Sequence, residues 1–89
     1  MIYGHFPLRI DESVGGSAVY VTITPDVSAE MVREAAFRDA LPIIEAHNHP
    51  EVHVVCDNPA LAVAFVLGAL PALGGCEVIV NGRVAQKKR

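Results

Sequence analysis

Three of the four histidines and one of the two cysteines lie within residues 47–56, directly before an Asp-Asn-Pro segment. Imidazole, thiolate and carboxylate groups are the usual ligands of transition metals, and they are also common acids and bases in hydrolases. The candidate catalytic residues are therefore His47, His49, His53 and Asp57. Whether these residues can act together depends on the elements that carry them.

Residues 51–56, EVHVVC, predict a β-strand that separates the candidates. His47 and His49 precede this strand, whereas Asp57 follows it. A strand of about six residues is roughly 20 Å long, at ~3.3 Å per residue. The two histidines and Asp57 therefore form no dyad within one subunit, and a second subunit is needed to bring them together.

The same strand geometry argues against a metal site. His53 and Cys56 point to opposite faces of the strand, so they do not share a metal ion. The possible metal ligands that remain are His47, His49 and His53, and Glu51 on the surface is a further one. The first two histidines lie where a helix ends, so no period fixes their directions. We therefore predict no metal and no cofactor.

The Asp-Asn-Pro segment predicts the start of a helix, with Asp57 or Asn58 as the N-cap and Pro59 at the first helical position. Backbone N–H groups at a helix start that follows a parallel strand commonly bind anions. Asn58 and the backbone around Ala60 are therefore the candidate binding residues for a small phosphorylated ligand. Capping alone also explains these residues, and the helix dipole explains imidazoles at a helix end.

Strand-like and helix-like segments alternate along the chain, which predicts an α/β fold. Strands are predicted within residues 5–10, 18–24, 51–56 and 77–80, helices within 24–47 and 59–70, and a type I′ hairpin at the Asn-Gly pair 81–82. We expect a small single-domain α/β sandwich, with a mostly parallel β-sheet, βαβ crossovers and an antiparallel N-terminal edge hairpin. Residues 1–84 form the domain, and residues 85–89 form a basic C-terminal tail.

Several local features sharpen this expectation. In HFPLRI, Phe6 is expected to face inward, and Pro7 places the strand at a sheet edge. Pro42 removes a helical hydrogen bond, so a kink or break is expected just before it. Val55 makes its strand apolar on both faces, which predicts cover on both sides. Residues 60–66 also suit a strand, but their alanine content and length favour a helix.

Composition and charge limit the classes of partner. Four of the seven basic residues lie within 83–89, and the net charge is −3. The body of the chain is therefore acidic, which argues against duplex nucleic acid as a partner. The uncharged stretch 58–76 contains two prolines and three glycines, which favours a buried helix over a membrane-spanning one. No secretory signal opens the chain and two cysteines make no disulfide framework, so we predict a cytoplasmic protein.

The predicted second helix, ALAVAFVLGAL, is apolar around its whole circumference. One face of this helix can pack on the sheet, but a domain of this size has nothing left to cover the opposite face. Soluble monomers rarely expose an apolar patch of several hundred Å². We therefore predict a homo-oligomer, most simply a two-fold dimer, with Gly68 allowing backbones to approach closely.

The order of elements from VYVTITPDVSAEMVREA onward is similar to that of STAS domains, over about two-thirds of the chain. The resemblance is one of topology. Regulatory STAS domains carry an Asp-Ser-Ser-Gly-Leu segment where this chain has Asp57-Asn58-Pro59-Ala60-Leu61. The resemblance therefore implies no phosphorylation role here.

Two functions remain after these exclusions. The chain has no Gly-rich phosphate loop, no Cys-x-x-Cys pair and no Gly-x-Ser-x-Gly segment. The first function is a small cytoplasmic binding or regulatory module that acts as a homo-oligomer. The alternative is a small hydrolase or nuclease-like enzyme that acts on a phosphorylated or nucleotide ligand, with its His/Asp site completed across a dimer interface. Alanine at the candidate residues abolishes turnover in the second case, and changes stability or assembly in the first.

Overall fold

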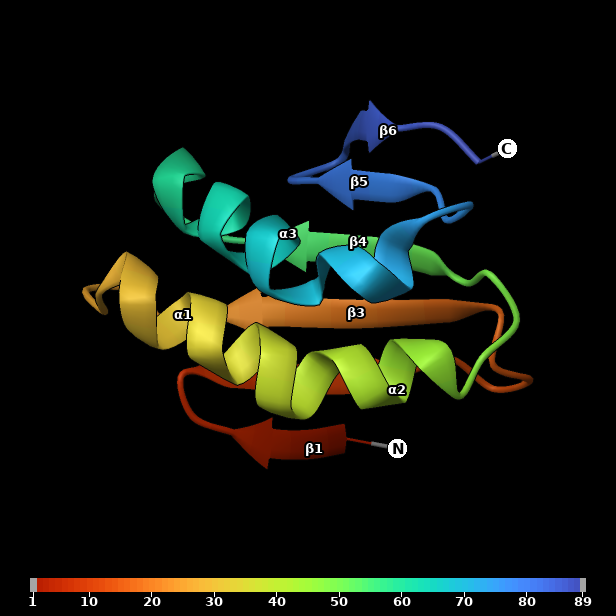
Figure 1. The fold of residues 1–89 in the computed structure, drawn as a ribbon, viewed down its shortest axis with the longest axis horizontal. Coiled ribbons are helices and arrows are strands. Elements are labelled where there is room, and N and C mark those ends of the chain that lie inside the picture. The colour runs from red at the N-terminus through yellow and green to blue at the C-terminus, as the bar shows by residue number, and fades with distance from the viewer. Residues whose placement is uncertain (1, 89) are drawn as a thin grey trace.

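A single six-stranded sheet runs through the protein, and the helices pack on one of its faces (Figure 1). The computed structural model describes residues 2–88. The strands follow one another across the sheet in chain order: β1 (Ile2–His5), β2 (Leu8–Glu12), β3 (Ala18–Ile23), β4 (Glu51–Val55), β5 (Val78–Val80) and β6 (Arg83–Gln86). The predicted α/β class is therefore confirmed.

The sheet is mixed, because parallel pairing is confined to its centre. Strands β3, β4 and β5 are parallel, whereas β1–β2, β2–β3 and β5–β6 pair in the antiparallel sense. The expected parallel sheet is thus shown only for the two βαβ units. Both units step in the same direction across the sheet, and Figure 1 shows their helices on the same face.

The N-terminal edge has one strand more than the sequence predicted. The chain turns at Phe6 and Pro7, so β1 is the edge strand and β2 lies inside the sheet. Leu8 and Ile10 face the core as expected, but Phe6 is 66 % exposed. The expected inward position of Phe6 is wrong, because a residue in a turn does not follow the alternation of the strand that comes after it.

The first helical region is interrupted before Pro42, as predicted. Helix α1 (Ala29–Ala35) begins at Ser28, whose hydroxyl accepts a hydrogen bond from the Met31 N–H at 3.1 Å. A π-helical turn, η1 (Ala36–Ala40), then leads into α2 (Leu41–Glu45). The wider turn fits a proline, which has no N–H to donate to the preceding turn.

Helix α3 (Pro59–Leu73) settles the alternative left open for residues 60–66, which are helical. Its buried residues face the sheet and the first helical region. Gly68 lies against α1, and a Cβ added there would be 2.2 Å from the Arg33 carbonyl oxygen and 2.8 Å from Ala36 Cβ. Only glycine permits this distance between the two backbones. No helix among the described residues is both long and apolar enough to cross a membrane.

The core lies between the helices and one face of the sheet. Val52 and Val54 of β4 are fully buried in this layer, together with Phe65 of α3. On the other face of β4, Val55 is 53 % exposed and Tyr20 of β3 is also exposed. The expected cover on both sides of β4 is therefore wrong, because both crossovers place their helices on the same face of the sheet.

The β5–β6 hairpin turns at Asn81 and Gly82, which have φ of 49° and 82°. Two successive positive φ values define the type I′ turn predicted from the Asn-Gly pair. Strand β6 continues to Gln86, so it includes two residues assigned to the tail by composition. The Gln86 amide donates hydrogen bonds to the carbonyl oxygens of Leu73 at 2.7 Å and Cys76 at 2.9 Å, and so ties β6 to the end of α3.

Candidate functional site

The loop between α2 and β4 places His47 and His49 at the amino end of β4. His47 Nε2 lies 2.5 Å from Glu12 Oε1 at the end of β2, and both side chains are largely buried. The His47 ring also packs against Gly16, where a side chain would collide with it. His47 therefore ties this loop to the β2–β3 turn.

The other two histidines have different surroundings. His49 has a positive φ of 50°, and its ring packs against Gly75, just after α3. His53 lies on the open face of the sheet, where its ring stacks on Tyr20 with centroids 4.8 Å apart. His53 Nε2 is 3.0 Å from Glu51 Oε1 on the same strand. The three histidines thus contact different elements.

Asp57, Asn58 and Ala60 lie at the carboxyl end of β4, as predicted. Asn58 is the N-cap of α3: its Oδ1 accepts from the Ala60 N–H at 3.0 Å, and its carbonyl oxygen accepts from the Leu61 N–H at 2.9 Å. The capping oxygen therefore already has a donor within the fold. Asp57 is exposed beside it. The structure keeps this group and the histidine loop at opposite ends of β4, which is the separation expected from strand length.

No group of three or more His, Cys, Asp or Glu side chains within residues 6–88 has the arrangement of a metal site. The two cysteines are buried free thiols. Burial raises the pKa of the Cys76 thiol, which donates a hydrogen bond to the Ala72 carbonyl oxygen at 3.5 Å. A thiol held in its protonated form is a poor nucleophile.

Asn81 is a polar residue whose role the sequence did not reveal. Its Oδ1 accepts from the Cys56 N–H at 3.0 Å, and its Nδ2 donates to the Cys56 carbonyl oxygen at 2.9 Å. The side chain thus continues the sheet pairing beyond β4 and holds the loop that leads to α3. The Asn-Gly signal indicated the turn, but not this contact 25 residues away in the sequence.

Asn81→Ala is expected to lower the free energy of unfolding by about 2 kcal/mol. The change leaves the Cys56 N–H and carbonyl groups without their partner, and it puts alanine at a positive φ that asparagine tolerates better. Urea denaturation at one protein concentration measures the loss. Asn48→Ala, at an exposed loop position, is the control. Equal midpoints for the two variants contradict this role for Asn81.

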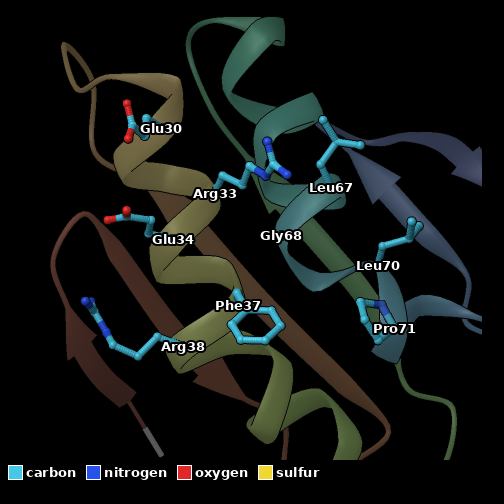
Figure 2. A pocket seen from close by; sticks show the side chains of 9 residues that line it. All are labelled: Glu30, Arg33, Glu34, Phe37, Arg38, Leu67, Gly68, Leu70 and Pro71. Atoms are coloured by element: carbon cyan, nitrogen blue, oxygen red, sulfur yellow. The ribbon is translucent and has the colours of Figure 1, made fainter.

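A groove of about 740 Å³ lies between the outer sides of the first helical region and α3 (Figure 2). Its apolar lining includes Phe37, which is 63 % exposed, and Leu67 and Leu70, which are both more than half exposed. Gly68 lies in the groove where the two helices touch. The sequence indicated the apolar helix, but not the contribution of Phe37.

An apolar stripe continues this groove along α3. Val63, Leu67 and Leu70 lie at positions i, i+4 and i+7, and each is more than half exposed. A second hollow, lined in part by Val63 and Leu67, adjoins the first. We call the surface formed by Phe37, Val63, Leu67 and Leu70 the α3 face.

Charged side chains border the α3 face. Figure 2 shows Arg33 extending from α1 towards Leu67, while Glu30 and Glu34 project from the other side of α1. Arg38 is engaged by Asp39, with Nη2 and Oδ2 2.8 Å apart. The border therefore carries both signs of charge around an apolar centre, which is the usual composition of a protein–protein interface.

No protein-family model, curated protein or solved structure matches this chain.

Proposed function

We propose that the protein is a small cytoplasmic binding or regulatory module that acts as a homodimer, joined through the α3 face. The observation that carries this proposal is the stripe of three aliphatic side chains on α3, with Phe37 beside it, all more than half exposed. Clustered apolar side chains of this kind mark interaction surfaces, whereas isolated ones are ordinary. The buried free cysteines suit a reducing compartment.

The dimensions of the molecule on its helical side support a second copy of the protein as the partner that covers the α3 face. The two longest dimensions of the molecule are 31 and 24 Å, and the helices lie across this broad side in Figure 1. A rectangle with these two extents has an area of about 740 Å², which is of the same order as the ~800 Å² per partner of an interface of standard size. Docking of a second helix layer covers the α3 face without any further segment.

The charges around the α3 face also suit a two-fold arrangement. A two-fold axis brings the same surface of both copies together, so each group meets a group of its own surface. The Arg33 side chain has no hydrogen bond or ion pair with another side chain of residues 6–88, and it extends towards Leu67, whereas Glu30 and Glu34 project from the other side of the same helix. A second copy can therefore place these carboxylates opposite Arg33.

The polar contacts favour a binding module over the hydrolase alternative. His47 is engaged by Glu12, Asn58 caps its own helix and Asn81 holds Cys56. Each of these groups has a structural partner. A hydrolase needs Asp57 of one copy beside a histidine of the other, and the α3 face contains neither residue.

Leu67→Glu tests the proposed interface, and Val55→Glu is its matched control. The two side chains are equally exposed, at 52 % and 53 %, but Val55 lies on the open face of the sheet. Leu67→Glu puts a carboxylate into the centre of the interface and is expected to weaken dimerisation at least about tenfold. Sedimentation velocity measures both variants. Dimers that persist in Leu67→Glu but dissociate in Val55→Glu place the interface on the sheet instead.

A further inference from the structure

Strand β6 forms the second edge of the sheet, on the side opposite β1. All four of its residues are exposed, and no strand within residues 2–88 pairs with its outer side. The strand is nevertheless held firmly, since Gln86 is bonded to the end of α3 and the type I′ turn joins β6 to β5. The fold therefore presents a fixed strand edge.

The hairpin geometry indicates which backbone groups of β6 are free to pair. In a two-residue hairpin the residues that flank the turn, Val80 and Arg83, form the hydrogen-bonded pair. The next pair, Ile79 and Val84, is then the non-hydrogen-bonded one. Beyond it the register shifts, so that Val78 pairs with Gln86 and Ala85 is an extra residue on β6. The N–H and carbonyl groups of Val84 therefore point away from β5, towards the outer edge.

The charge along this edge has one sign. Residues 78–88 include Arg83, Lys87 and Lys88 and no acidic residue. Two copies of β6 paired edge to edge bring these cations together, and like charges oppose such pairing. The edge therefore excludes a second copy of itself and complements a strand that carries carboxylates.

We propose that β6 binds an acidic, extended peptide segment of a partner protein, which adds to the sheet as a seventh strand. Main-chain hydrogen bonds to Val84 supply the pairing, and Arg83, Lys87 and Lys88 supply the preference for carboxylates. The exposed Val84 side chain adds an apolar contact on the open face of the sheet. This site lies on a sheet edge, apart from the α3 face, and goes beyond dimer formation.

The test uses fluorescently labelled octapeptides and anisotropy titrations of the full chain. The probe alternates Glu and Thr, and one control peptide alternates Lys and Thr. A labelled single-stranded oligouridine, which carries negative charge but has no peptide backbone, tests the nucleic-acid alternative. We expect the Glu-Thr peptide alone to bind, and its affinity to fall when NaCl is raised from about 0.05 to 0.5 M.

Two variants separate backbone pairing from charge. Val84→Pro removes the outward N–H without breaking the ladder to β5, and is expected to weaken Glu-Thr binding about tenfold, whereas Val84→Ala changes it less than about twofold. Arg83→Glu combined with Lys87→Glu and Lys88→Glu is also expected to weaken binding at least about tenfold. Tighter binding of oligouridine than of the peptide overturns the proposal, and so does unchanged peptide binding by Val84→Pro or by the charge variant. Leu67→Glu retains peptide binding, so failure of the dimer leaves this test intact.

Discussion

Gly68→Val is expected to lower the free energy of unfolding by about 3 kcal/mol, the upper part of the range for overpacked interiors. The new Cβ would lie 2.2 Å from the Arg33 carbonyl oxygen, and this oxygen belongs to backbone that cannot rotate away. Helix α3 must therefore move away from α1, and the buried residues between them lose contact.

Urea denaturation followed by circular dichroism measures this loss. Gly74→Ala is the matched control, because its added Cβ meets nothing within 4 Å and its φ of −63° suits any residue. We expect the control to change stability by less than about 0.5 kcal/mol. If Gly68→Val unfolds at the same urea concentration as the control, α1 and α3 are not packed as described.

Phe65→Ala is expected to lower the free energy of unfolding by about 4 kcal/mol, the middle of the range for truncation of a buried aromatic side chain. Phe65 is the largest fully buried side chain and faces the sheet from α3. Its removal leaves a cavity in a core otherwise built from aliphatic residues and two cysteines. Domains of this length have total stabilities of roughly 4–13 kcal/mol, so the variant is close to unfolding at room temperature.

Thermal denaturation checks this prediction, with Val55→Ala as the control. Val55 is half exposed on the open face, and its truncation is expected to cost less than about 1 kcal/mol. A melting temperature for Phe65→Ala close to that of the control contradicts the assignment of Phe65 to the core.

The elements with strong local signals could be predicted from the sequence. Asn58-Pro59 at the start of α3 and Asn81-Gly82 in a hairpin both occupy the expected positions. These signals depend on the chemistry of a few neighbouring residues, so tertiary packing does not override them.

The wrong predictions of the fold concern features that depend on several elements together. Val55 and Val54 make β4 apolar on both faces, yet only one face is covered, because both crossovers place their helices on the same side. Phe6 alternates correctly with Leu8 but belongs to a turn. Apolar alternation alone indicates neither the side of a crossover nor the point where a strand turns back.

The candidate site could be predicted in part. Strand length predicted that the histidines at 47 and 49 lie at the opposite end of β4 from Asp57. The partners of these groups could not be predicted, since Glu12 meets His47 across 35 residues of sequence. The α3 face likewise needs the contact at Gly68, which brings Phe37 beside the apolar stripe.

The molar mass of the unmodified protein tests the central claim most directly. Sedimentation equilibrium at protein concentrations between about 10 and 500 µM measures the average molar mass. Over this range, mass action shifts a monomer–dimer equilibrium towards the dimer. We expect the mass to rise with concentration towards about twice the 9.5 kDa of one chain. A mass that stays at 9.5 kDa over the whole range contradicts the homodimer.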